Sequence, residues 1–191
     1  LSLRLLTKTY FFANFILTYL KSCLRYTFLS ISYLYTNYAD WESFDLTFYR
    51  SVALYGGILA ALLGGYLSDK VNSQLIIKIS HISLGFLCLL IAIHTNIIMN
   101  QFFGIGILLA FSFFNSFALT AVLALCMKFS LSSSAASIFA IFMSTRHFSR
   151  IIGETFAGIS DGFFNLTVGS IYLIAAFLCI LPLTFLSYFK L

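Results

Sequence analysis

Three charged residues spaced four apart interrupt one of the most apolar stretches of this sequence. Arg146, Arg150 and Glu154 lie in "STRHFSRIIGETFAGISDG" (144–162), which has apolar residues on both sides. Four-residue spacing places all three on one face of a helix. Arginine binds carboxylates and phosphates through paired hydrogen bonds, and carboxylates in membrane helices carry protons. This charged stripe (Arg146, Arg150, Glu154) therefore predicts two anion-binding residues and, in Glu154, a proton-coupling residue.

A second basic pair has the same spacing near the start of the chain. Lys21 and Arg25 are four apart in "YLKSCLRYTF" (19–28). A charged side chain at the bilayer centre costs about 2.5–3.5 kcal/mol, so these groups must face protein or water. A salt-bridge network around Glu154 is one alternative, but a single carboxylate cannot neutralise four cations. We therefore expect Lys21 and Arg25 to join the two stripe arginines in binding an anionic substrate.

The elements that hold these residues are predicted to be membrane helices. Of 191 residues, 61% are hydrophobic and 9% charged, with a mean hydropathy of +1.00. About a quarter of a typical globular chain is charged. Six continuous apolar segments are each long enough to cross a bilayer as a helix, near residues 10–32, 51–67, 75–97, 102–127, 135–159 and 168–189. The sequence predicts an all-α membrane protein whose residues 1–191 form a single six-helix transmembrane bundle.

Lysine and arginine positions predict the orientation of this bundle. With six spans, both termini and the following basic residues fall on one side: Arg4, Lys8, Lys70, Lys78, Lys128 and Lys190. The opposite side carries Asp161, the acidic loop "YTNYADWESFD" (35–45) and, as its only basic residue, Arg50. Because cytoplasmic loops are enriched in lysine and arginine, we expect both termini to be cytoplasmic.

Small, aromatic, histidine and cysteine residues support smaller predictions. Two stripes of small residues in the second span, Gly57–Ala61–Gly65 and Gly56–Ala60–Gly64, favour a close helix contact. The aromatic residues around Trp41 suit a belt at the membrane interface. His81 and His94, near the ends of the third span, are expected to be interfacial too. The four cysteines, which lie in apolar runs without paired spacing, are expected to be buried thiols: Cys23, Cys88, Cys126 and Cys179.

Two stretches resemble transporters of the major facilitator superfamily. "GGYLSDKV" (64–71), expected in a cytoplasmic loop, matches the gating motif of that superfamily at Gly65, Asp69 and Lys70. The segment 124–162 resembles the tenth-to-eleventh helix region of AmpG-type muropeptide permeases, through the "ALCMK" stretch and the later Ala157–Gly158 pair. Counting from Cys126 selects Arg146 as the family arginine, whereas counting from Ala157 selects Arg150.

This resemblance implies that the chain is the C-terminal six-helix half of a twelve-helix bundle. It would act with an N-terminal half or with a second chain, because substrate binds between the two halves. The implied function is secondary active transport: proton-coupled import of anhydro-muropeptides across the bacterial cell inner membrane. Two alternatives stay open, a facilitator for another organic anion and a non-transporting half-length remnant or scaffold.

Several function classes have no supporting pattern in the sequence. There is no Ser/His/Asp grouping, metal-ligand cluster or GxxxxGK[ST] loop, so we expect neither an enzyme nor a bound metal or cofactor. The basic residues are dispersed, so nucleic acid is not an expected partner. The expected partner is the lipid bilayer.

Overall fold

The described part of the chain is built from long helices. The computed structural model describes residues 35, 41–95, 100–129, 135–162 and 167–187. These ranges contain α2 (Ser43–Lys70), α3 (Ser73–Ile93), α4 (Gln101–Phe129), α5 (Ala135–Gly162) and α6 (Val168–Ser187). Each of these helices overlaps one of the last five predicted spans. The first predicted span, near 10–32, lies outside the described residues, together with Lys21 and Arg25.

Three of the described helices are long and apolar enough to cross a membrane. They run over Phe44–Lys70, Ser73–Ile93 and Gln101–Leu125, and a shorter apolar helix covers Val168–Leu181. At 1.5 Å per residue, even the 21 residues of α3 extend about 30 Å, which is the thickness of the hydrocarbon core. The prediction of apolar helices long enough to span a membrane is confirmed for these three, and the count of six spans stays a prediction.

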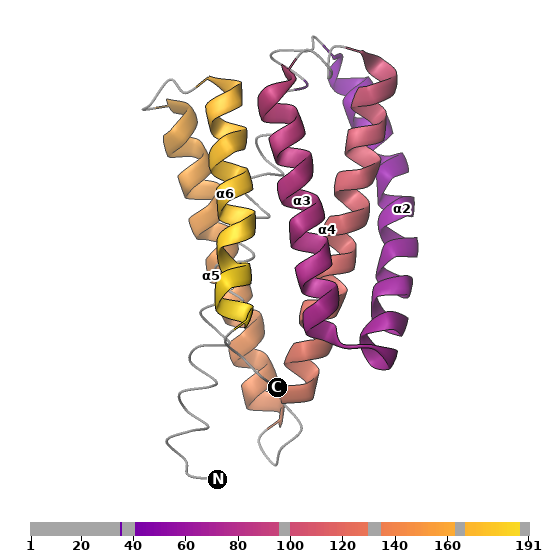
Figure 1. Ribbon diagram of the computed structural model, residues 1–191, viewed down its shortest axis with the longest axis vertical. Coiled ribbons are helices and arrows are strands. Elements are labelled where there is room, and N and C mark those ends of the chain that lie inside the picture. The colour runs from indigo at the N-terminus through magenta and orange to yellow at the C-terminus, as the bar shows by residue number, and fades with distance from the viewer. Residues whose placement is uncertain (1–34, 36–40, 96–99, 130–134, 163–166, 188–191) are drawn as a thin grey trace.

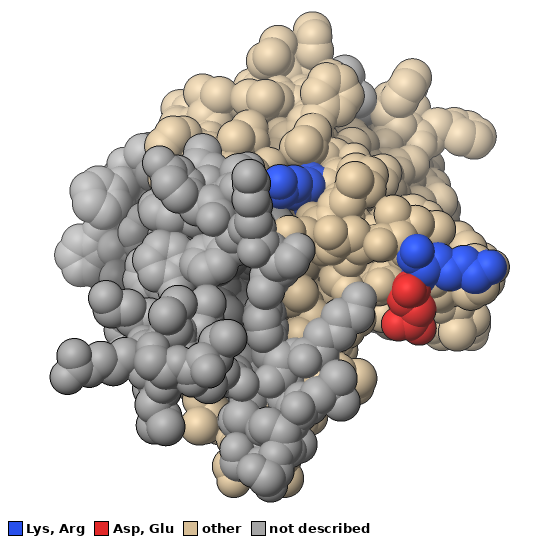
Figure 2. All heavy atoms as spheres, turned by 60° about the horizontal axis from the view of Figure 1, so that its bottom comes forward, with Lys and Arg blue, Asp and Glu red and all other residues tan. Residues whose placement is uncertain are grey.

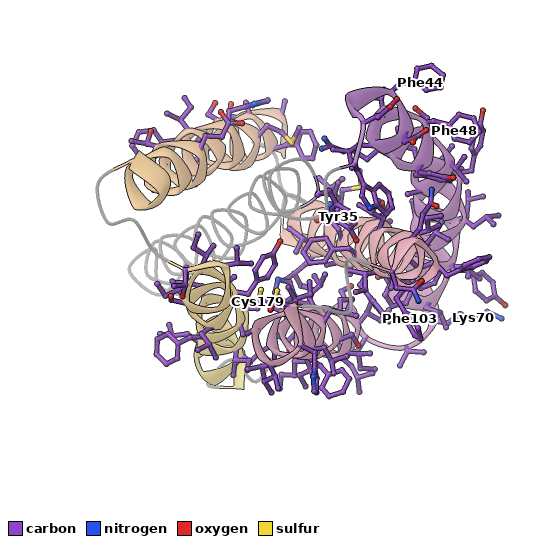
Figure 3. The ribbon with its side chains drawn as sticks, turned by 90° about the horizontal axis from the view of Figure 1, so that it is seen from above. Tyr35, Phe44, Phe48, Lys70, Phe103 and Cys179 are labelled. Carbon is purple, nitrogen blue, oxygen red and sulfur yellow. The ribbon has the colours of Figure 1, made fainter. Side chains whose placement is uncertain are left out.

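Successive helices run in alternating directions (Figure 1). α4 packs against both α2 and α3, and α3 packs in turn against α6. The result is a row in the order α2, α4, α3, α6, in which α2 and α4 point the same way. α5 lies apart from α2, on the other side of the molecule (Figures 1 and 3), and among the described helices its main contact is a slight one with α4.

The apolar core lies where α3, α4 and α6 meet. It includes Leu84, Cys88, Phe111, Tyr172 and Cys179, each no more than 2% exposed. Cys88 and Cys179 are free thiols, and Figure 3 shows Cys179 pointing inward from α6. The prediction of buried thiols is confirmed for these two. The side chains of Cys23 and Cys126 lie outside the described residues.

Large apolar side chains also cover the outward faces of the helices. On α2, Phe44 and Leu62 are 76% and 68% exposed, and Phe102 at the start of α4 is 87% exposed. Figure 3 shows Phe44 and Phe48 pointing away from the bundle. Exposed apolar patches of this extent are rare on monomeric proteins in water. They suit helices that face lipid acyl chains.

The contact between α2 and α4 depends on small residues, but not along the two stripes expected from the sequence. Beyond Leu46 near its start, the buried positions of α2 are Ala53, Gly57, Ala60, Gly64 and Ser68, which take members from both predicted stripes. An α-helix has 3.6 residues per turn, so residues spaced strictly four apart drift around the helix axis. A straight contact line alternates between spacings of three and four, and α4 follows that line.

α2 is longer at both ends than its predicted span of 51–67. It begins at Ser43, so Asp45 of the expected acidic loop lies in the first helical turn, and it ends at Lys70. The gating motif therefore lies in the last turns of a helix and not in a loop, which corrects the prediction. The predicted span was too short because a hydropathy criterion leaves charged residues out. An acidic first turn and a basic last turn complement the helix dipole, so they favour a longer helix.

Candidate functional site

The backbone of α5 places the charged stripe on one face, as the sequence predicts. α5 is an unbroken helix of 28 residues, Ala135–Gly162. Arg146 and Arg150 lie on either side of its midpoint, and Glu154 follows one turn later. Glu154 is half-buried, whereas the side chains of Arg146 and Arg150 lie outside the described residues.

The opposite face of α5 is apolar and exposed. Ile141, Phe148 and Ile152 are 56%, 62% and 43% exposed. At about 100° per residue, these positions are centred roughly 180° around the helix from the charged stripe. Gly153, on the same side as the stripe, is buried. The residue pattern therefore separates α5 into a face suited to lipid and a charged face turned away from it.

The residues of the predicted gating motif lie at the end of α2. Asp69 and Lys70 are exposed, and the Lys70 ammonium lies 4.6 Å from the centre of the Tyr66 ring. A Cβ on Gly65 would lie 3.6 Å from Thr120 Cγ2, an ordinary contact with α4. The motif thus combines one residue at a helix interface with two charged residues open to the surroundings.

The two ends of the described helices differ in their balance of charged residues, with Asp69 beside Lys70 at the mainly basic end. Lys70 in the last turn of α2, Lys78 early in α3 and Lys128 late in α4 share one end. Figure 2 views this end and shows basic side chains, with acidic ones beside them at the outer edge. Glu42 and Asp161 lie at the other end, before α2 and at the close of α5. Alternating helix directions therefore group these residues as the sequence predicts.

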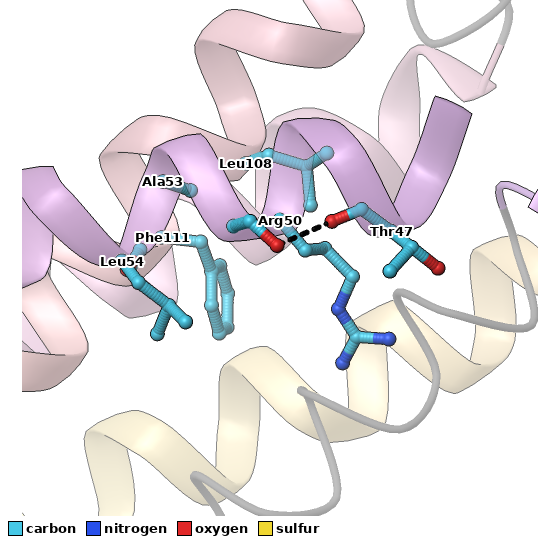
Figure 4. Close-up of a pocket in the computed structure, with 8 residues that line it drawn as sticks. Thr47, Arg50, Ala53, Leu54, Leu108 and Phe111 are labelled. Carbon is cyan, nitrogen blue, oxygen red and sulfur yellow. Dashed lines mark hydrogen bonds between the residues drawn. The ribbon is translucent and has the colours of Figure 1, made fainter. Parts of the chain in front are cut away.

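A cavity between α2 and α4 contains a cation to which the sequence analysis gave no binding role. Its volume is about 310 Å³, and its lining includes Arg50. Arg50 is half-buried and lies within α2, although the prediction placed it outside the spans. In Figure 4 the side chains of Arg50, Leu54 and Phe111 project to the same side of α2. The sequence already indicated that Arg50 is helical: the spacing of Thr47, Arg50 and Leu54 extends the helical pattern of the apolar run toward the N-terminus.

Tyr35 and Trp41 dock onto α4 before α2 begins, and the burial of Tyr35 corrects its expected role in an interfacial belt. For Trp41, which is partly buried, that role stays a prediction. Tyr35 is fully buried, and its hydroxyl donates a hydrogen bond of 2.6 Å to the carbonyl oxygen of Gly104. The Trp41 ring packs edge-on against Tyr35, with 4.6 Å between ring centres. Burial raises the pKa of the Tyr35 phenol above its ordinary value. Gly104 allows this packing, because a Cβ there would lie 2.8 Å from Trp41 Cζ2.

His81 is buried, whereas the sequence predicts an interfacial residue. Its exposed fraction is 0%, and its Nδ1 lies 2.8 Å from the carbonyl oxygen of Ile77. Within the described ranges, Nε2 has no hydrogen-bond partner. His81 lies on the same face of α3 as the buried residues Ile77 and Leu84, and α3 packs against α4 and α6. His94, at the other end of α3, is exposed as expected.

No cluster of three or more His, Cys, Asp or Glu residues suited to a metal occurs among the residues the structure describes. Comparison with protein-family models, with curated proteins and with solved structures finds no match. Function must therefore be argued from the charged positions and the packing of this chain itself.

Proposed function

We propose that this chain is a six-helix half of a secondary active transporter for an anionic solute. The observation that carries the proposal is the division of α5 into two faces. Ile141, Phe148 and Ile152 are exposed on one face, and the charged stripe occupies the other. A helix of this length that crosses a bilayer beside α4 would bring the stripe to mid-depth.

Cations at that depth require a specific environment. Turning Arg146 or Arg150 toward lipid would cost about 2.5–3.5 kcal/mol each. A face that points to a polar pathway avoids this cost, since water or a bound anion then solvates the guanidinium groups. Lys21 and Arg25 in the first predicted span would add two cations to the same pathway. Their summed positive charge favours a solute with carboxylate or phosphate groups.

Glu154 is proposed to couple transport to protons. It lies one turn beyond Arg150 on the same face and is half-buried. When the site is empty, an ionised Glu154 can balance a neighbouring arginine. Protonation would release that arginine to bind the solute, so one proton and one anion would move together. This order of events accounts for a carboxylate placed among cations.

The resemblance to AmpG-type permeases suggests the substrate and the partner. Anhydro-muropeptides carry peptide carboxylates, which suit the proposed cations. In that family the solute binds between two six-helix halves, which rock about it. We therefore propose that this chain pairs with an N-terminal half or a second chain in the bacterial inner membrane. Both termini would be cytoplasmic, and Asp69 and Lys70 would gate that side.

Uptake of a labelled anhydro-muropeptide into proteoliposomes tests the proposal, with the partner half included. Arg146→Gln and Arg150→Gln should each lower uptake at least about tenfold, because a hydrogen bond to a charged group contributes about 1.5–3 kcal/mol. Glu154→Gln should remove the dependence of uptake on a proton gradient. Lys78→Gln, which removes a cation from α3, is the matched control and should leave uptake unchanged.

The same assay separates the alternatives. Uptake of other organic anions, but not of muropeptide, with the same sensitivity at Arg146 and Arg150 would support a different anion facilitator. Equal uptake by wild type and both arginine variants would refute the proposal. Absence of uptake for every anion tested would favour a non-transporting scaffold.

A further inference from the structure

His81 is an ionisable residue buried well inside an apolar helix. It lies eight residues after Ser73, the first residue of α3, and therefore about 12 Å along the helix. Its side chain is 0% exposed. Ionisable residues are rare at such a depth in membrane helices, and those that occur face the protein interior and often take part in proton transfer. The depth and burial of His81 therefore make it a candidate for a function.

One hydrogen bond fixes the tautomer of the neutral His81 ring. Nδ1 lies 2.8 Å from the carbonyl oxygen of Ile77, one turn earlier in α3. A carbonyl oxygen can only accept a hydrogen bond, so Nδ1 carries the proton and Nε2 presents a lone pair. Nε2 is buried and has no hydrogen-bond partner within the described ranges. The basic nitrogen of the ring is thus held without a donor to satisfy it.

The helices with the most extensive packing against α3 provide no counter-charge for a protonated His81. α3 packs mainly against α4 and α6. Within the described ranges, these three helices contain no aspartate or glutamate, and their charged residues are Lys78, one turn before His81, and Lys128. Their other titratable side chains are thiols or a phenol, which are neutral near pH 5–7: Cys88, Cys126, Tyr172 and Cys179.

Carboxylates do occur on α2 and α5, but away from His81. On α2, Asp69 is exposed beside Lys70 in the last turn, and Asp45 lies in the first turn, at the far end of the helix. Glu154 belongs to α5, whose main contact among the described helices is with α4. Burying a charge without a partner costs far more than burying a neutral ring. The packed helices therefore oppose protonation of His81.

The contact between α3 and α6 has a weak point near His81. A Cβ on Gly85, one turn after His81, would lie 3.1 Å from Ile180 Cγ1, so the two helices approach closely there. They run antiparallel (Figure 1), which places His81 level with the turn of α6 that follows Ile180. That turn contains Pro182, the only proline of the chain. Proline lacks an amide hydrogen, so it removes one backbone hydrogen bond from α6 and favours a bend.

We propose that Nε2 of His81 is a proton-binding site that couples acid pH to the separation of α6 from α3. In the packed arrangement the ring stays neutral. When α6 bends away, water reaches the ring, donates a proton to the Nε2 lone pair and solvates the imidazolium. Because the open arrangement binds the proton better, acid shifts the population toward it. The charged stripe takes no part, so the proposal does not depend on the transport function.

The buried thiols of α3 and α6 report on this opening. Cys88 and Cys179 are both 0% exposed. The experiment uses the full chain in neutral detergent, with Cys23 and Cys126 replaced by alanine. It measures the rate at which dipyridyl disulfide, which reacts with thiols at acid pH, labels the two remaining cysteines. Dividing each rate by that of His81→Gln at the same pH cancels the pH dependence of the thiol chemistry itself.

The expected effect follows from the titration of histidine. Histidine in water has a pKa of about 6.5, so a ring that is protonated only in the open arrangement raises the open population about 25-fold between pH 7 and pH 5. The labelling rate relative to His81→Gln should therefore rise at least tenfold over that range. His94→Gln, which removes an exposed histidine directly after α3, is the matched control and should behave as the wild type does. A labelling rate with the same pH dependence in wild type and His81→Gln would overturn the proposal.

A second measurement uses the wild type and keeps the proposal testable if His81→Gln does not fold. Nitrogen NMR of the histidine-labelled chain distinguishes the two tautomers and the imidazolium, and His94→Gln and His147→Gln assign the other two signals. His81 should be the neutral Nδ1–H tautomer at pH 7 and should become charged over the pH range in which the thiols become accessible. An Nε2–H tautomer at pH 7, or thiols that open while His81 stays neutral, would refute the proposal.

Discussion

Replacing Gly64 by alanine measures how closely α2 and α4 approach each other. A Cβ on Gly64 would lie 3.1 Å from Phe117 Cδ2 and 3.2 Å from the Phe117 carbonyl oxygen. The oxygen belongs to the backbone of α4 and cannot rotate away, so the two helices must separate by a few tenths of an ångström. Gly65, the next residue, has room for a methyl group, because its nearest neighbour would be Thr120 Cγ2 at 3.6 Å.

Comparing Gly64→Ala with Gly65→Ala separates the effect of the helix contact on the free energy of unfolding from the effect of helix propensity. Both substitutions replace a helical glycine by alanine, which stabilises a helix by up to about 1 kcal/mol. Only Gly64→Ala also overpacks an interface, and overpacking costs about 1–3 kcal/mol. The propensity gain cancels in the difference between the variants. Gly64→Ala should therefore have a free energy of unfolding about 1–3 kcal/mol lower than that of Gly65→Ala.

Reversible unfolding in mixed micelles, followed by circular dichroism, provides both free energies on the same scale. Gly64→Leu should lower the free energy of unfolding further, since a larger side chain meets the same backbone atom. Equal free energies for the two alanine variants, within about 0.5 kcal/mol, would refute the reasoning. The close approach of α2 and α4 would then not depend on the absence of a side chain at Gly64.

Three further predictions concern contacts near the helix ends. Gly104→Ala should displace the Trp41 ring, because the new Cβ would lie 2.8 Å from Trp41 Cζ2, and the Trp41 fluorescence maximum should move to longer wavelength. Gly106→Ala is the control: the space around Gly106 is open, so this variant should leave the maximum unchanged. Tyr35→Phe should lower the free energy of unfolding by about 0.5–1.5 kcal/mol, because it removes the buried hydrogen bond from the Tyr35 hydroxyl to the carbonyl oxygen of Gly104. Burial raises the folded-state pKa of Tyr35, so its contribution to folding stability is complete below the unfolded pKa near 10 and is lost as pH rises above that value. The free energy of unfolding, measured between pH 9 and 11, should therefore fall less steeply with pH in Tyr35→Phe than in the wild type. Asn72→Ala should destabilise the start of α3 by about 0.5–2 kcal/mol, since its side chain accepts a 3.0 Å hydrogen bond from the amide of Gln74, and a lower unfolding free energy would verify this.

Much of the helical framework was predictable because apolar length is a local property. The segments predicted near 75–97, 102–127, 135–159 and 168–189 correspond to α3, α4, α5 and α6, with ends that differ by a few residues. α2 deviates most, since its start at Ser43 depends on an acidic first turn that hydropathy treats as loop. The shared face of Arg146, Arg150 and Glu154 was also predictable, because it needs only an unbroken helix.

The candidate sites depended on information that single segments do not contain. Arg50 was assigned to the outer side of the membrane, and only the packing of α4 beside α2 creates a cavity next to it. His81 has the sequence surroundings of an interfacial histidine, yet it is completely buried on α3, which packs against α6. In both cases the partner is a helix more than fifty residues away in the chain, so local patterns could not identify it.

Local residue patterns suffice to predict that this chain forms long apolar helices, that lysines gather at one end of them, and that α5 carries a charged face. These properties follow from hydropathy, helical periodicity and residue spacing within each segment. The packing of the helices establishes which small residues of α2 face α4, which aromatic groups are buried, and that Arg50 lines a cavity. Those outcomes depend on the rotation of each helix about its axis, which is set by side-chain packing against neighbours that are distant in sequence.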